Sequence, residues 1–217
     1  MQELEPRLRD GLARLTLALD DAQVGQCLAY LELLQKWSRI YNLTAVREPE
    51  AMLTQHLLDS LAVVRPLLQQ APQARRLLDV GSGAGLPGVL LALACPALEV
   101  TCVDAVSKKV AFIQQVAGAL GLANLRGRHT RIESLPEPTD LSWDVVTARA
   151  FSSLADLVNA SSAALAPEGV WMALKGQLPE QEMASLPPGV GVFHVEQLQV
   201  PFLKAQRCLV WMRRARR

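Results

Sequence analysis

From Arg75 onward the chain alternates short apolar segments with helical ones, and this alternation restricts the fold more than any other feature. Helical patterns occupy Pro87–Ala94, Ser107–Leu120 and Ser153–Ala166. The predicted strands are Arg76–Val80, Glu99–Asp104, Leu125–His129, Asp144–Thr147, Val170–Lys175, Val192–Val200 and Gln206–Met212. Such alternation implies right-handed βαβ units and a mostly parallel α/β sheet with helices on both faces. Only about five residues separate the last two strands, too few for a helical crossover, so we expect an antiparallel C-terminal hairpin.

The residues before Arg75 follow a helical pattern. The i, i+3, i+4, i+7 spacing of an amphipathic helix is formed by Val24, Cys27, Leu28, Leu31 and Leu34. Asp20 or Asp21 is available as its N-cap. A second helix is predicted to begin at Pro49 and to stop at Pro66, with a connection over Trp37–Glu48 between the two.

This change of pattern divides the chain into an N-terminal helical extension, residues 1–74, and a sheet domain, residues 75–217. A chain of 217 residues, half of them hydrophobic, is able to bury one large core. We therefore expect the two parts to form one compact unit, and we expect a monomer.

Composition excludes several classes of protein. The sequence contains no run of about 18 apolar residues, the length that would indicate a membrane span. The charged segment Met1–Asp10 differs from a secretion signal, so we expect a cytoplasmic protein. The four cysteines lie far apart without a CxxC pair, which predicts reduced thiols and no metal site. The net charge is only +1, so any RNA binding must come from a local patch, for which Arg213–Arg217 is one candidate and a solvated tail the alternative.

A glycine-rich segment, Gly81–Gly88, follows the first predicted strand and opens a helix. In open α/β sheets, ligands bind at the carboxyl ends of the strands, and glycine lets the backbone approach them closely. Gly83, Gly85 and Gly88 also satisfy GxGxxG, so this motif alone does not separate a dinucleotide from S-adenosylmethionine.

Two neighbouring residues favour S-adenosylmethionine. Asp79 stands where a pyrophosphate would approach, and its carboxylate suits a cofactor with sulfonium and ammonium groups instead. Pro87 removes an N–H from the helical turn in which a pyrophosphate needs donors. Asp104 ends the second strand, where an acidic residue usually accepts the ribose hydroxyls of either cofactor. The sequence thus predicts a class I methyltransferase, Rossmann-like in its sheet, with Asp79, Gly83 and Asp104 in the cofactor site.

The segment after the fourth predicted strand narrows the methyl acceptor. Thr147–Phe151 contains neither the Asn/Asp-Pro-Pro-aromatic pattern of amino-group methylation nor the cysteine of cytosine C5 methylation. A target that is already a nucleophile needs only placement opposite the methyl group. Guanine N7 is such a target, but some small-molecule amines remain equally admissible.

A combination of motifs spread over nearly the whole chain resembles one family. The matching residues are Lys36-Trp37, Tyr41–Arg47, His56–Ser60, Asp79–Gly88, Arg149-Ala150-Phe151 and Ala173–Gly176. They resemble the bacterial small-subunit ribosomal RNA guanine-N7 methyltransferases, also called the glucose-inhibited division protein B family. The resemblance implies methylation of N7 of one guanine in 16S rRNA, so that the partner is 16S rRNA or the small ribosomal subunit.

The resemblance also implies site residues. The cofactor site carried over by motif consists of Gly81, Leu86, Ile132, Glu133 and Arg149, with Asp79 and Asp104 contacting the methionine and ribose ends. The residues expected to face RNA are Arg131, Arg149 and Lys175. No side chain is expected to be an obligatory catalytic base, since guanine N7 carries no proton.

Simpler interpretations stand beside these. Arg131 and Arg149 would equally serve as surface or salt-bridge residues, and His56, among leucines, is better read as a structural histidine. Asn42 either contacts substrate or caps a turn. For the whole chain, the alternatives are a methyltransferase for another RNA or a small amine, an NAD-dependent oxidoreductase, and a non-catalytic ribosome-assembly factor.

Overall fold

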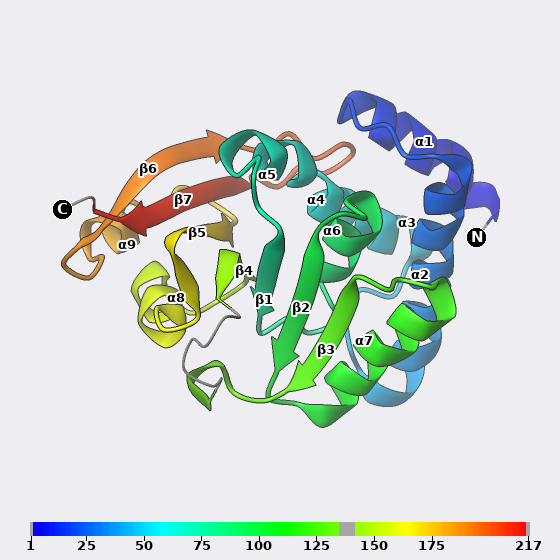
Figure 1. The fold of residues 1–217 in the computed structure, drawn as a ribbon. Coiled ribbons are helices and arrows are strands. Elements are labelled where there is room, and N and C mark those ends of the chain that lie inside the picture. Colours follow the sequence, from blue (N-terminus) through cyan, green and yellow to red (C-terminus); the bar gives the residue numbers. More distant parts are fainter. Residues whose placement is uncertain (1, 135–141, 216–217) are drawn as a thin grey trace.

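The structure is a computed structural model that describes residues 2–134 and 142–215. It contains a seven-stranded sheet with helices on both sides (Figure 1). The strands are β1 (Arg76–Val80), β2 (Glu99–Asp104), β3 (Leu125–His129), β4 (Trp143–Arg149), β5 (Leu165–Lys175), β6 (Val190–Gln197) and β7 (Cys208–Arg214). The α-helices are α1 (Glu5–Arg14), α2 (Asp21–Tyr41), α3 (Pro49–Met52), α4 (Asp59–Leu61), α5 (Val64–Gln70), α6 (Gly88–Ala94), α7 (Ser107–Leu120), α8 (Leu154–Ser161) and α9 (Glu180–Ala184). The segments η1 (Gln2–Leu4) and η3 (Ile132–Ser134) are 3₁₀ turns, and η2 (Leu53–Leu58) is a π-helix.

The strand order is β3-β2-β1-β4-β5-β7-β6. Strands β1 to β5 pair in parallel, whereas β7 is antiparallel to both β5 and β6. The mostly parallel α/β sheet with an antiparallel end is therefore confirmed. Because the chain moves outward from β1 in both directions, the order reverses between β1 and β4, and ligands bind beside such a reversal in open α/β sheets.

The helices cover the sheet unequally. Helices α6 and α7 pack on one face of β1–β3, and α2 packs over both of them (Figure 1). Helix α8 contacts β5 and lies on the opposite face. On that face, β3 presents Arg126 and Arg128 to solvent, and within the described residues no helix packs over them. The expected cover on both faces is thus present around β4 and β5 and incomplete over β2 and β3.

The first predicted helix is present, with Asp20 as its N-cap. The Asp20 carboxylate accepts from the backbone N–H of Gln23 at 2.8 Å, and the Gln23 side chain accepts from the Asp20 N–H at 3.0 Å. This reciprocal pair satisfies two of the N–H groups that a helix start leaves open. The helix continues to Tyr41, so the prediction of a connection beginning at Trp37 was wrong. Asn42 ends the helix in the left-handed conformation, which is the turn-capping role considered for it.

The second predicted helix begins at Pro49 as expected but ends before Pro66. It runs through α3, η2 and α4 to Leu61. Pro66 instead lies in the first turn of α5, where proline is tolerated because the N–H groups of a first turn have no intrahelical partner. The prediction that Pro66 ends a helix was therefore wrong.

Two shorter differences occur near the C-terminus. The connection between β6 and β7 spans residues 198–207, longer than expected, because β6 ends at Gln197 and β7 begins at Cys208. The antiparallel pairing of these two strands is as predicted. Helix α8 ends at Ser161, and β5 begins at Leu165, within the range predicted to be helical.

The helical extension and the sheet share one apolar core. Leu31 and Leu34 of α2, Leu57 of η2, and Leu91 and Phe112 of the helices on the sheet belong to one cluster of buried side chains. None of the four cysteines forms a disulfide, and three of them are buried. Across the described ranges, no helix is both long and apolar enough to span a membrane.

The shared core predicts that one substitution in the extension destabilises the whole protein. Leu31 is fully buried, so Leu31→Ala should lower the free energy of unfolding by about 2–5 kcal/mol. The neighbouring exposed residue gives the control, Glu32→Ala, with an expected change within about 0.5 kcal/mol. Urea unfolding followed by far-UV circular dichroism and by tryptophan fluorescence should give coincident transitions in both variants. Separate transitions for the two signals would show that the extension unfolds independently.

Candidate functional site

The glycine loop at the end of β1 uses a backbone conformation that other residues avoid. Gly81, Gly83 and Gly85 have φ values of 64°, 59° and 79°, in the left-handed region. A Cβ on Gly85 would collide with the Val89 side chain, so that glycine permits close packing. A Cβ on Gly83 would meet only the Gly81 carbonyl oxygen, at 4.0 Å, so the space in front of the loop is open to a ligand.

Asp79 lies behind this loop and is fully buried. Its Oδ2 accepts from the backbone N–H of Gly88 at 2.9 Å, at the first residue of α6, while its Oδ1 is buried with no hydrogen-bond partner. Burial raises the pKa of Asp79 to about 7, although the Gly88 bond and the charge of Arg149 act in the opposite direction. The start of α6 is therefore occupied by a carboxylate of the chain itself.

Asp104 ends β2 beside the same loop. Its Oδ2 accepts from the Gly83 N–H at 3.0 Å, and its Oδ1 accepts from the Val106 N–H at 2.9 Å. Lys109 lies 3.5 Å from Oδ2. These contacts fix a carboxylate at the carboxyl edge of the sheet, with its second lone pairs available for the hydroxyls of a ribose.

A cavity of about 380 Å³, the glycine-loop hollow, opens at this edge. Its lining residues are Val80, Gly81, Val103, Asp104, Ala105, Thr130, Arg131, Ile132 and Phe151. They come from the ends of β1 and β2 and from the segments that follow β3 and β4. The hollow therefore lies where the strand order places a ligand site.

A second cavity, of about 360 Å³, lies over the ends of β4 and β5 and is called the Asp59 hollow. Its lining residues are Gln55, His56, Asp59, Arg149, Ala150, Leu174, Lys175, Gly176 and Arg207. The short segment Ala150–Phe151 joins the two cavities, since Ala150 lines one and Phe151 the other. Ala150 has a φ of 59°, a strained value for a residue with a Cβ, and such strain is frequent at functional sites.

A buried carboxylate ties three parts of the chain together in the Asp59 hollow. Asp59 Oδ1 accepts from Arg207 Nε at 2.9 Å, and Oδ2 lies 3.4 Å from Arg149 Nη1. Arg149 also donates to the Gln55 carbonyl at 3.2 Å. The helical extension is thus bound to the end of β4 and to the segment that precedes β7.

Lys175 and His56 have protein partners in the same hollow. Lys175 Nζ lies 2.8 Å from a Glu182 carboxylate oxygen, and only 13% of its side chain is exposed. His56 Nε2 is 2.8 Å from Thr44 Oγ1, and burial followed by the charge of Arg149 lowers the His56 pKa to about 4. His56 is consequently neutral at pH 7 and held inside the protein, as a structural histidine is.

The structure distributes the predicted site residues over three places. Gly81, Asp104, Ile132 and Arg131 line the glycine-loop hollow. Asp79 and Leu86 are buried behind the loop, while Arg149 and Lys175 line the Asp59 hollow. Glu133 lies in η3, but its side chain is outside the described part of the chain, as are the last two residues of the Arg213–Arg217 tail.

Three residues of the site were missed by the sequence prediction. The Tyr30 hydroxyl donates to the carbonyl of Ala84 at 2.8 Å, so α2 holds the glycine loop from behind. Asp59 and Arg207 form the ion pair described above. The local signals for Asp59 were a carboxylate among leucines and its place in the family motif His56–Ser60, whereas no local signal marks Arg207.

The buried carboxylate of Asp79 predicts a pH-dependent gain on its removal. The folded pKa of about 7 lies above the ordinary value of 3.8, so the free energy of unfolding falls as the pH rises between these values. Asn keeps an acceptor for the Gly88 N–H without the buried charge. Asp79→Asn should therefore match the wild type near pH 4 and exceed its stability at pH 8, on the order of 2–4 kcal/mol.

Urea unfolding at both pH values checks this expectation. Asp144→Asn is the control, because Asp144 also accepts two backbone N–H groups, those of Arg75 and Arg76, but is only half-buried. It should show no comparable gain at pH 8. Equal effects of Asp79→Asn at pH 4 and pH 8 would contradict the assignment.

Similarity to known proteins identifies the family of this chain. Residues 23–210 match the model of the family described as rRNA small subunit methyltransferase G. The chain is 57% identical to ribosomal RNA small subunit methyltransferase G of Albidiferax ferrireducens over 99% of both chains. It is 59% identical to the same-named protein of Methylibium petroleiphilum, over 95% of this chain and 93% of the other. Among solved structures, 1,6-didemethyltoxoflavin-N1-methyltransferase of Burkholderia thailandensis, with bound S-adenosylhomocysteine, shares the fold at 12% identity, with a TM-score of 0.57 and 92% of each chain covered. The chain belongs to the rRNA small subunit methyltransferase G family.

Proposed function

We propose that the protein transfers a methyl group from S-adenosylmethionine to N7 of a guanine in 16S rRNA. Family membership supports rRNA methylation, since the relatives carry that activity in their names. The choice of guanine N7 rests on the family resemblance of the sequence motifs and on the acceptor segment Thr147–Phe151, which offers neither a cysteine nor an Asn-Pro-Pro pattern.

The observation that carries the cofactor assignment is the occupied start of α6. In a dinucleotide site, the pyrophosphate binds to the free N–H groups at this helix terminus. Here the first of them, on Gly88, donates to the buried Asp79, and Pro87 before it has no N–H to offer. The N–H groups that a phosphate would use here are occupied or missing, which favours a cofactor without phosphates in the glycine-loop hollow.

The hollow contains groups suited to each end of such a cofactor. Asp104 would accept the two ribose hydroxyls, and the open space at Gly81 and Gly83 would receive the amino-acid end. When bound, S-adenosylmethionine supplies an electrophilic methyl group. The guanine N7 lone pair needs no proton removed before attack, so the task of the chain is to hold the base in line with the methyl group and to exclude water.

The three residues proposed to face RNA differ in whether a carboxylate of the protein already binds them. Arg131 is exposed at the mouth of the glycine-loop hollow. Arg149 and Lys175 are each held by a carboxylate, Asp59 and Glu182 respectively. A phosphate would have to compete with these carboxylates, so we expect Arg131 to make the strongest RNA contact of the three.

Substitution of the loop glycine tests the cofactor site. In Gly83→Val a branched side chain would fill the open space in front of the loop at a left-handed backbone position, which costs on the order of 1–3 kcal/mol in strain. Binding of S-adenosylhomocysteine, measured by calorimetry, should be lost. Gly118→Val is the control, because a Cβ there also meets no atom within 4 Å but lies on α7 away from the loop.

Thermal denaturation of both variants separates loss of binding from loss of folding. A folded Gly83→Val variant that binds S-adenosylhomocysteine like the wild type would refute the placement of the cofactor. Tight NAD binding by the wild type, without S-adenosylhomocysteine binding, would support an oxidoreductase instead.

Methyl transfer from labelled cofactor to 16S rRNA and to intact small subunits tests the reaction itself. Mapping of the product should locate the label at N7 of one guanine. The single-turnover rate at saturating substrates should be flat between about pH 6.5 and 8.5, because no proton is abstracted. A single-proton dependence that persists in Asp79→Asn would count against N7, and a wild type that binds RNA without transferring a methyl group would be an assembly factor.

A further inference from the structure

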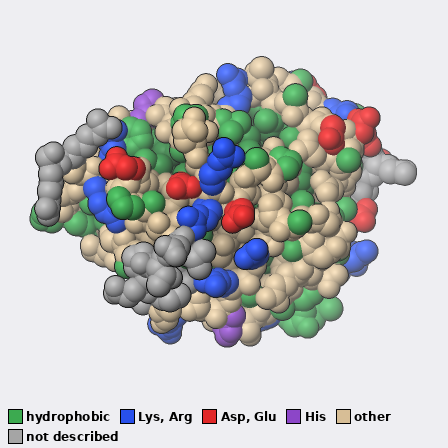
Figure 2. All heavy atoms as spheres, in the orientation of Figure 1, with side chains coloured by type: hydrophobic (Ala, Val, Ile, Leu, Met, Phe, Trp, Pro, Cys, Tyr) green, Lys and Arg blue, Asp and Glu red, His purple; other side chains and the backbone are tan. Residues whose placement is uncertain are grey.

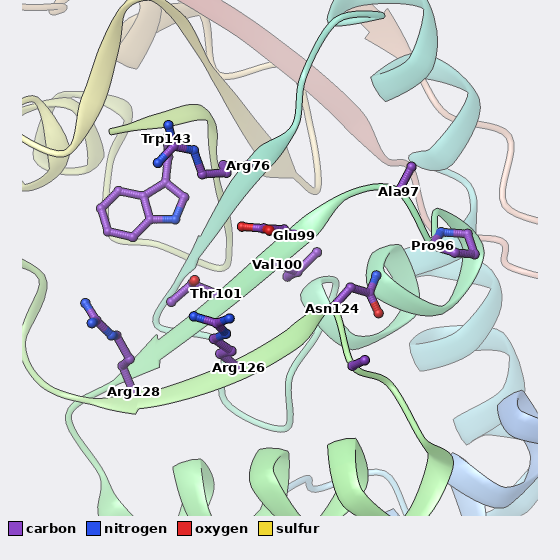
Figure 3. A pocket seen from close by; sticks show the side chains of 11 residues that line it. Arg76, Pro96, Ala97, Glu99, Val100, Thr101, Asn124, Arg126, Arg128 and Trp143 are labelled. Atoms are coloured by element: carbon purple, nitrogen blue, oxygen red, sulfur yellow. The ribbon is translucent and has the colours of Figure 1, made fainter. Parts of the chain in front are cut away.

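A third cavity lies at the amino ends of β1, β2 and β4, on the part of the sheet face over β2 and β3 that no described helix covers. Its volume is about 360 Å³. The residues that line it are Arg76, Pro96, Ala97, Glu99, Val100, Thr101, Ala123, Asn124, Arg126, Arg128 and Trp143 (Figure 3). We call this region of β2 and β3, with Arg76 of β1 beside it, the open sheet face.

The two-residue period of the strands separates the two faces cleanly. On β3, Leu125 is buried, and a Cβ on Gly127 would contact Val110 and Ile113 of α7. Arg126 and Arg128, between and after them, point to the other side and are exposed. Alternation of this kind is typical of a strand that is covered on one face only.

Uncovered parallel strands are unusual, because parallel sheets occur almost only with both faces buried. In this protein the uncovered strands carry charge in place of apolar residues. Among the described residues that line the cavity, Arg126 and Arg128 are exposed cations, and Glu99 is a carboxylate. Within the described part of the chain, no ion pair neutralises Arg126 or Arg128. The face therefore suits an anionic partner.

The open sheet face is continuous with the glycine-loop hollow. In the β2–β3 register, Arg126 lies beside Thr101 and Arg128 beside Val103, a residue that also lines the glycine-loop hollow. Arg131 follows three residues later at the mouth of that hollow. Figure 2 shows Lys and Arg side chains gathered over the centre of this side of the molecule, with isolated acidic groups among them.

The spacing of the arginines fits a polyanionic chain. Arg126 and Arg128 are two residues apart on one strand, which corresponds to about 6.6 Å along the strand, a distance comparable with that between successive phosphates of an RNA strand. Guanidinium groups bind phosphate oxygens in pairs, and contacts of this kind position a nucleic acid without reading its sequence.

We propose that the open sheet face binds the ribose-phosphate backbone of the rRNA next to the target nucleotide, with Arg126 and Arg128 as the phosphate ligands. This proposal rests on the proposed function. Arg131 then continues the track to the methyl-transfer site. Arg126 and Arg128 act in substrate binding only, because neither of them lines the glycine-loop hollow.

A salt titration of binding to a 16S rRNA transcript tests the proposal. The slope of log K against log salt concentration is negative. Arg126→Ala and Arg128→Ala should each reduce its magnitude by about 0.7–0.9, and the double variant by about twice as much. Arg126→Lys and Arg128→Lys should keep the slope, because they keep the charge. Glu99→Gln should bind more tightly than the wild type, since it removes the carboxylate found in the described lining of the cavity.

Arg65→Ala is the matched control, an exposed arginine on α5 outside the open sheet face. Its slope should equal that of the wild type. The affinity for S-adenosylhomocysteine and the thermal midpoint should be unchanged in all these variants. A change in both quantities would show a structural role and overturn the proposal.

The outcomes separate this proposal from the proposed function. Wild-type methyl transfer with wild-type slopes in Arg126→Ala and Arg128→Ala overturns the open sheet face and leaves the activity intact. Unchanged binding to the transcript with weakened binding to the intact subunit would assign the face to a ribosomal protein, which also overturns the proposal. A wild type that neither binds nor methylates rRNA overturns both.

Discussion

The hydrogen bond between the Asp79 carboxylate and the Gly88 N–H, at 2.9 Å, fixes the part of the structure on which the site depends. It joins the last residues of β1 to the first residue of α6, and it thereby sets the path of the glycine loop between them. Burial disfavours the ionised carboxylate and raises the pKa of Asp79 to about 7. The hydrogen bond from the Gly88 N–H partly offsets this effect. Tyr30 adds a second restraint from α2, on the Ala84 carbonyl. The loop is thus preorganised by groups that lie behind it.

The same arrangement explains why the site favours one chemistry over another. Both Asp79 and Asp104 place carboxylates next to backbone N–H groups that would bind a phosphate in other α/β proteins. Each of these N–H groups is already bonded to a side chain of the protein and is therefore not free to bind a diphosphate. Beyond the loop, Arg131 is exposed at the glycine-loop hollow, whereas Arg149 and Lys175 at the Asp59 hollow are paired with Asp59 and Glu182.

Periodicity and strand ends were enough to predict the sheet and the loop, because both depend on neighbours in the sequence. The bounds of β1, β2, β3 and α7 agree with the predicted segments residue by residue. Contacts between distant parts of the chain were not predictable in this way. Asp59, at the start of α4, and Arg207 are 148 residues apart, and only the tertiary fold brings them within hydrogen-bond distance. Pro66 misled the prediction because a proline stops one helix or starts another, and the surrounding pattern does not distinguish these cases.

The position of β7 in the sheet has a consequence for synthesis on the ribosome. Among the described strands, β6 pairs with β7 alone, and β7 lies between β5 and β6 although it follows both in the chain. While the protein is being made, β5 has an unpaired edge and β6 has no place to attach until Cys208–Arg214 has emerged. The nascent chain consequently passes through a stage in which most of its core is assembled beside an open strand edge, the kind of surface that recruits chaperones or other chains.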